Sequence, residues 1–135
     1  MAKNGLINDR VRDINGVVLF DAKFKPVELA FAAAETWPAG AVLGRVTATG
    51  RYVRYNPAAS DGSQVPSAIL TEAVTQSAAG NITYSVAVSG EFRVGDLTDA
   101  TGTALTANSS ADFALRDYGF ILRDVYETTF RDNNA

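Results

Sequence analysis

Residues 81–88 constrain the fold most, because apolar residues alternate there with small or polar ones. Successive side chains of an extended strand point to opposite faces, so the alternation places four apolar side chains on one face. The four are Ile82, Tyr84, Val86 and Val88. We therefore predict a β-strand over this segment. Gly90 is expected to interrupt it as a bulge or bend, after which Phe92 and Val94 resume it.

Shorter apolar runs bounded by turn residues predict further strands. A turn at residues 49–50 separates two of them, which indicates a hairpin. The predicted strands are residues 17–20, 41–47, 51–55, 68–70 and 120–122. We expect the first of them to end at residues 21–26, where charged residues lead to a proline. Residues 27–36 fit either a strand or a short alanine-rich helix, and we favour the strand.

One short helix is predicted near the end of the chain. Ser109 and Asp112 have the spacing of a capping box, with Asp in the place of Glu. Gly119 fits a helix stop directly after Tyr118. We therefore expect a mainly β fold, of the α+β class, with one short helix near the C-terminus.

The length of 135 residues is enough for one compact domain with a modest core. Residues 1–16 are polar, with isolated apolar residues and no clear period, which predicts a flexible N-terminal arm. We expect the β-rich domain to span residues 17–122 and a C-terminal tail to span residues 123–135.

The chain contains neither cysteine nor histidine. These absences exclude disulfides, thiolate nucleophiles, the Ser-His-Asp arrangement and the commonest metal ligands. The formal charge of −3 argues against nucleic-acid binding, which depends on an excess of Lys and Arg. We expect no enzyme activity, no cofactor and no metal.

Two groups of acidic residues are candidates for a functional site, one for calcium binding and one for hydrolysis. The segment 96–102 has carboxylates at i and i+3, which fits a solvated turn better than a calcium loop. Four carboxylates, Asp96 among them, would suggest a small hydrolase only if two of them paired, and no spacing favours any pair. These residues are Asp61, Glu72, Glu91 and Asp96.

No segment has the pattern of a signal peptide or a membrane span. The longest mostly apolar stretch, residues 27–34, contains Glu28 and is too short to cross a bilayer. We expect a soluble protein made in the cytoplasm, with no membrane partner.

Two apolar features have alternative interpretations. The arm residues Leu6, Ile7, Val11 and Ile14 are either disordered filler or a strand that pairs with the sheet edge of a partner. Trp37, the single tryptophan, lies beside Pro38 at a turn and is either a core residue or an interface anchor.

Five segments, in this order and spacing, resemble the phage head decoration proteins, the family of the lambda-type capsid-stabilising protein D. They are AGAVLGRV at 39–46, YVRYNPAASDGSQVP at 52–66, AILTE at 68–72, VSGEFR at 88–93 and LRDYGFIL at 115–122. This chain differs from the simplest members by extra sequence before Trp37 and a longer tail after Leu122.

The resemblance implies a compact β-rich homotrimer on the outer face of the expanded phage head, at three-fold and quasi-three-fold positions. Family members hold neighbouring major capsid protein subunits together against the outward push of packaged DNA. Their N-terminal arm orders on the capsid and pairs with a capsid strand. The protein would thus be part of the virion surface and be made in the host cytoplasm.

We therefore predict two sets of contact residues. The predicted capsid-binding residues are Leu6, Ile7, Val11, Ile14, Val17, Val18, Leu19 and Phe20. The predicted trimer interface contains Trp37, Pro38 and Phe92. An alternative function is a carbohydrate- or receptor-binding module on the virion surface that uses exposed Tyr52 and Tyr55.

Overall fold

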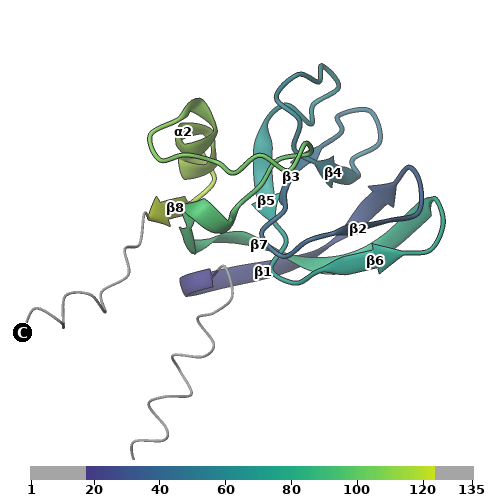
Figure 1. Cartoon of the computed structure of the whole chain (residues 1–135), viewed down its shortest axis with the longest axis horizontal. Helices are drawn as coiled ribbons and strands as arrows, with labels where there is room; N and C mark the ends of the chain where they lie inside the picture. Colours follow the sequence, from purple (N-terminus) through teal and green to yellow (C-terminus); the bar gives the residue numbers. More distant parts are fainter. Residues whose placement is uncertain (1–17, 124–135) are drawn as a thin grey trace, which may run out of the picture.

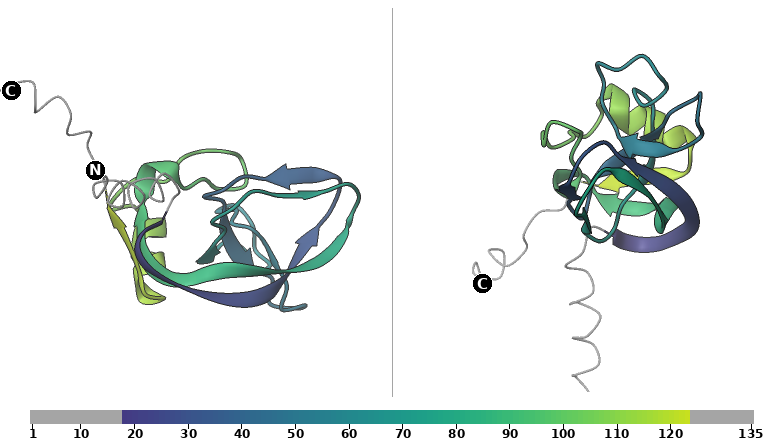
Figure 2. Two further views of the ribbon diagram at one scale, coloured as in Figure 1. Left: turned by 90° about the horizontal axis from the view of Figure 1, so that it is seen from below. Right: turned by 90° about the vertical axis from the view of Figure 1, so that its right-hand side faces the viewer.

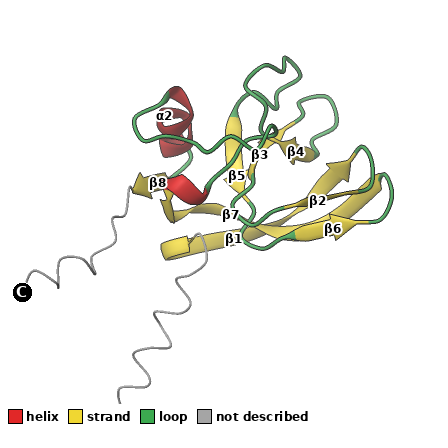
Figure 3. Cartoon of the chain, viewed as in Figure 1, coloured by secondary structure: helices red, strands yellow, loops and turns green. Residues whose placement is uncertain are grey.

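The computed structural model describes residues 18–123. Its elements, in chain order, are β1 (Val18–Phe31), β2 (Glu35–Trp37), β3 (Val42–Arg45), β4 (Tyr52–Arg54), β5 (Pro66–Ile69), β6 (Val74–Gln76), β7 (Gly80–Arg93), the 3-10 helix η1 (Val94–Asp96), α2 (Ser110–Asp117) and β8 (Phe120–Arg123). The fold is mainly β with one short α-helix near the C-terminus (Figure 3), which confirms the predicted fold class.

Six strands form one sheet in the order β1-β4-β3-β5-β7-β8. Because β1 also pairs with β7, the first five strands of this order close on themselves. The strand β8 pairs in parallel with the edge of β7 that faces away from β1. The strands β2 and β6 form a separate two-stranded sheet. Helix α2 and β8 lie at one end of the molecule and the β2–β6 pair at the other (Figure 1).

The longest pairing joins β1 and β7, which run side by side along one flank of the molecule (Figure 2). Its register shifts between Val18 and Phe24, where Asp21 has a φ of +53°. On the facing strand Gly90 has a φ of +133°, and a Cβ there would lie 2.7 Å from the Cα of Ala22. Gly90 therefore lies at an irregularity of the β1–β7 ladder, as predicted, although β7 itself continues through it.

The prediction that the first strand ends at residues 21–26 is wrong, since β1 continues to Phe31. Pairing with β7 holds this polar segment in an extended conformation. Pro26 lies opposite Ser85 of β7, and the only described pairing of β1 with another strand is Leu29 with Tyr52. A proline fits where its missing N–H faces no ladder partner.

The core consists of two buried clusters of hydrophobic residues, one at each end of the molecule. One cluster lies under α2 and contains Phe92 and Phe120, whose ring centroids are 5.5 Å apart. The other lies between the closed strands and the β2–β6 pair and contains Trp37 and Phe31. Burial of these aromatic rings supplies much of the stabilisation that a chain without disulfides needs.

The helix prediction is confirmed. The hydroxyl of Ser109, the N-cap residue, accepts a hydrogen bond from the Asp112 amide at 3.3 Å, and Gly119 follows the helix with a φ of +100°. No helix in residues 18–123 is long and apolar enough to span a membrane.

Candidate functional site

The predicted arm contacts fall on both sides of the first described residue. Leu6, Ile7, Val11, Ile14 and Val17 lie outside the described residues. The others begin β1: the backbone of Val18 pairs with Phe92 and that of Phe20 with Glu91. Capsid contact by these eight residues stays a prediction.

The start of β1 fixes where an N-terminal arm leaves the domain. Phe92 of β7 has Val18 of β1 on one side and Leu122 of β8 on the other. The N-terminal end of β1 therefore lies beside the end of the sheet at which β8 finishes its pairing with β7, near Arg93 and Arg123.

The predicted interface residues differ in their surroundings. Trp37 is 2% exposed and Phe92 is fully buried, whereas Pro38 is exposed. The indole N–H of Trp37 donates a hydrogen bond to Glu35. In a single chain, Trp37 is thus a core residue, and only Pro38 of the three offers side-chain surface to a second copy. The trimer contact itself stays a prediction.

The four carboxylates weighed for hydrolysis each interact with a different neighbour. Asp61 accepts from the Ser63 hydroxyl at 2.6 Å, Glu72 from the Tyr84 hydroxyl at 2.8 Å, Glu91 from Arg123 at 2.7 Å, and Asp96 pairs with Arg93 at 3.3 Å. The Ser63 hydrogen bonds lower the pKa of Asp61, and the hydrogen bond to Glu72 raises the pKa of Tyr84. These contacts hold turns and neighbouring strands together.

The segment weighed as a calcium loop is a hydrogen-bonded turn. Oδ1 of Asp99 accepts from the amide and hydroxyl of Thr101, at 2.8 and 2.7 Å, and from the Thr103 amide at 3.1 Å. Partial burial raises the pKa of Asp99, but these hydrogen bonds and the Arg54 charge outweigh it and lower the pKa below its ordinary value. Among residues 18–123, no cluster of three or more potential metal-ligating side chains occurs.

The alternative function required exposed Tyr52 and Tyr55, and this expectation is wrong for Tyr55. Its side chain is 7% exposed and belongs to the core cluster under α2, and burial raises the pKa of its hydroxyl. Tyr52 is half-buried. The reason for the burial of Tyr55 is tertiary packing, since its ring belongs to the cluster that also contains Val42 and Leu115.

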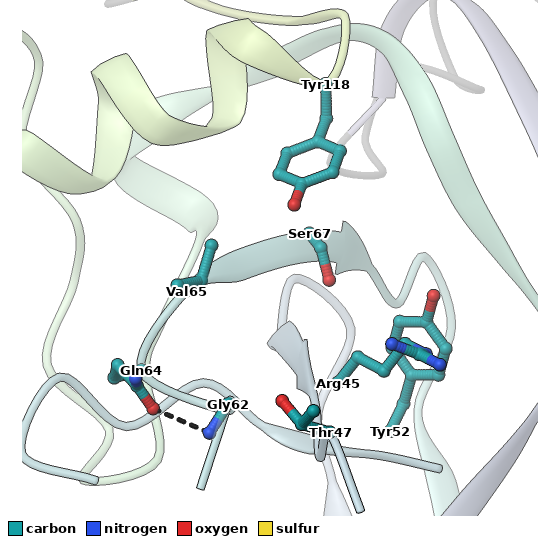
Figure 4. Close-up of a pocket in the computed structure, with 8 residues that line it drawn as sticks. All are labelled: Arg45, Thr47, Tyr52, Gly62, Gln64, Val65, Ser67 and Tyr118. Atoms are coloured by element: carbon teal, nitrogen blue, oxygen red, sulfur yellow. Dashed lines mark hydrogen bonds between the residues drawn. The ribbon is translucent and has the colours of Figure 1, made fainter. Parts of the chain in front are cut away.

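A pocket of about 410 Å³ lies between the β3–β4 hairpin, the loop before β5 and the end of α2 (Figure 4). Residues that line it include Arg45, Thr47, Tyr52, Gln64, Ser67 and Tyr118. They come from three segments far apart in the sequence, and no local motif joins them. Sequence analysis therefore missed the pocket.

The folded region of the chain matches the sequence model of a known protein family. Residues 20–120 match the family of the bacteriophage lambda head decoration protein D. The chain belongs to this family. The matched span runs from the start of β1 to the first residue of β8, which covers nearly all of the described decoration domain. No individual curated protein matches the chain.

Membership gives the chain a phage head decoration role, as a structural component of the virion that binds the capsid. In the decoration domain, carboxylates form hydrogen bonds and ion pairs within turns and between neighbouring strands.

Proposed function

We propose that the protein binds as a homotrimer to the outside of the expanded phage head, at three-fold and quasi-three-fold sites, and stabilises the head against internal DNA pressure. The observation that carries this proposal is the family match over residues 20–120, which spans the decoration domain from β1 to β8. In the same domain the carboxylates of Glu72 and Glu91 accept hydrogen bonds from Tyr84 and Arg123.

The arm of residues 6–20 is the proposed contact with the major capsid protein. An extended segment that adds to a sheet gains main-chain hydrogen bonds, and its alternate side chains provide specificity. Because Val18 already pairs with Phe92, an arm that continues β1 outward would start from a fixed strand. The ordering of the arm then begins at an anchored end, which lowers its entropic cost.

Three arms on one trimer would bind more tightly than any single arm. After one arm docks, the other two are held at high effective concentration near their sites. Binding that favours the expanded lattice stabilises that lattice by mass action. With a formal charge of −3, the protein is not attracted to the phosphates of the packaged DNA.

A variant of the arm tests the proposal. Serine is placed at Leu6, Ile7, Val11 and Ile14 in the full chain, and the matched control carries serine at Asn4, Asn8 and Asn15. Both proteins are measured by light scattering and then mixed with undecorated expanded heads. We expect both to be trimers of unchanged thermal stability, and only the control to bind and to raise the temperature at which heads release DNA.

Two results would contradict the proposal. One is a monomeric wild-type protein, both free in solution and on the head. The other is wild-type protein that coats heads at three-fold sites without raising the temperature of DNA release.

A further inference from the structure

Backbone of closely packed loops forms part of the wall of the pocket beside β3. Arg45 and Tyr52 lie opposite each other on β3 and β4, and the Tyr118 hydroxyl points into the pocket from the end of α2 (Figure 4). Gly62 in its wall has a φ of +113°, and a Cβ there would lie 2.5 Å from both the Arg45 carbonyl oxygen and the Thr47 hydroxyl. The wall of the pocket is therefore closely packed at Gly62.

Arg45 differs from Arg51 and Arg123, which have carboxylate partners. Arg51 pairs with Glu28 at 2.8 Å and Arg123 with Glu91 at 2.7 Å, whereas Arg45 forms no ion pair with any described residue. Within the part of the chain that the structure describes, no carboxylate lines the pocket. A free guanidinium on a protein with a formal charge of −3 makes this pocket a positive point on a mostly acidic molecule.

The other groups that reach the pocket can donate hydrogen bonds. Oε1 of Gln64 accepts from the Gly62 amide at 2.8 Å, which leaves the Gln64 NH₂ group free to donate. The hydroxyls of Thr47 and Tyr118 add two further donors. A guanidinium in a pocket that neutral donors also line suits an oxygen anion, and the fork of arginine matches a carboxylate.

The rim of the pocket is partly apolar. Val65 is 41% exposed and Tyr118 is 51% exposed, and both line the opening. Such a rim would contact the methylene stem of an acidic side chain, which a bare inorganic ion lacks. A polyanion such as DNA would need several cations, and this pocket contains one.

We propose that the pocket binds an Asp or Glu side chain on the outer surface of the major capsid protein. This inference rests on the proposed function, because it adds a second contact to the one made by the arm. The arm supplies extended main-chain pairing, and the Arg45 pocket fixes the orientation of the domain over the capsid surface. Charged pairs of this kind set register and specificity at an interface.

The test uses full-length protein and undecorated expanded heads. The variants are Arg45→Gln, Arg45→Lys and Tyr118→Phe, and the matched control is Lys25→Gln, which removes one exposed positive charge from β1. We expect Arg45→Gln to bind at least about tenfold more weakly, since a hydrogen bond to a charged group contributes roughly 10- to 150-fold. We expect Arg45→Lys to be intermediate, Tyr118→Phe to lose about tenfold, and Lys25→Gln to bind like wild type.

A second arm of the experiment identifies the ligand as a carboxylate. Surface carboxyl groups of the heads are converted to neutral amides before mixing. On these heads the wild type and Arg45→Gln are expected to bind equally, through the arm alone. A tenfold difference that persists on amidated heads would overturn the proposal.

The remaining outcomes separate this proposal from the proposed function. If wild type fails to bind heads, both are rejected. If wild type binds and Arg45→Gln binds equally well, only the pocket proposal is rejected. If Arg45→Gln dissociates from trimer to monomer in solution, Arg45 lies between copies of the chain and the proposed carboxylate contact is wrong.

Discussion

Phe31 stacks on Trp37, with ring centroids 3.9 Å apart and ring planes 19° apart. Both rings are buried, and the pair joins the end of β1 to β2. The indole N–H of Trp37 finds its partner in Glu35, so the polar atom of the ring is satisfied inside the fold. The single tryptophan is therefore the centre of the cluster beneath the β2–β6 pair.

Replacement of Trp37 by Ala is expected to lower the free energy of unfolding by about 3–5 kcal/mol, because it leaves a large cavity and removes the stacked ring. Unfolding in urea followed by far-UV circular dichroism measures the change. The control is Phe24→Ala, which removes a half-exposed ring and should cost much less. Equal losses of unfolding free energy in the two variants would show that Trp37 does not stabilise this cluster more than an exposed ring would.

Gly90→Ala is expected to destabilise the protein strongly. The φ of +133° alone costs an L-residue about 1–3 kcal/mol, and the added Cβ would meet the Cα of Ala22 at 2.7 Å. Gly95→Ala is the matched control, since nothing lies within 4 Å of a Cβ there, and its effect should stay within about 0.5 kcal/mol. Urea midpoints distinguish the two, and a Gly90→Ala midpoint as high as that of the control would disprove the close approach.

Ser109→Ala is expected to cost about 1 kcal/mol through loss of the helix cap. The Ser109 hydroxyl accepts from the Asp112 amide and donates to the Thr106 carbonyl oxygen at 2.7 Å, so the substitution removes two hydrogen bonds. Ser110→Ala serves as the comparison, because that residue is exposed at the first helical position. The thermal midpoint should fall for the first variant and remain near the wild-type value for the second.

The turn at Asp99 predicts a pH dependence of stability. Because the folded pKa of Asp99 lies below its unfolded value, the ionised carboxylate stabilises the fold above the ordinary Asp pKa of about 3.9. That contribution is lost as the pH falls through the folded pKa. Thr101→Val removes one hydrogen bond and should raise the Asp99 pKa toward its ordinary value, as measured by carbon-detected NMR titration.

The comparison for that titration is Thr106→Val, which alters an exposed threonine whose hydroxyl does not contact Asp99. Its Asp99 titration should coincide with that of the wild type. If Thr101→Val leaves the midpoint in place, the hydrogen bond from its hydroxyl does not contribute to the pKa.

Local patterns were sufficient to predict several elements. The alternation around Tyr84 gave a correct strand, the turn at residues 49–50 a correct hairpin, and Ser109 a correct helix start. In each case residues adjacent in sequence determine the conformation. The continuity of β1 through residues 21–26 could not be seen in this way, because the distant strand β7 holds this segment extended. The strands β2 and β6 are three residues each and mostly polar, too short to show a period.

The burial of Tyr55 and the pocket at Arg45 depend still more on tertiary structure, so sequence patterns could not predict them. Nothing in the sequence near Tyr55 indicates that distant residues such as Leu105 and Leu115 pack around it, so its burial was missed. The pocket at Arg45 requires the end of α2 to lie over the hairpin, and that placement arises from packing against the cluster around Leu115 and Phe120.

The register of β1 on β7 has a mechanical consequence. Eleven positions from Val18 to Phe31 are paired with β7. A pull on the chain ahead of Val18, when directed along the strand, would load these pairings together in shear rather than opening them one at a time. Tension applied at that end would therefore be shared along the whole length of the ladder, from Phe92 to Gly80, before any single hydrogen bond had to break alone.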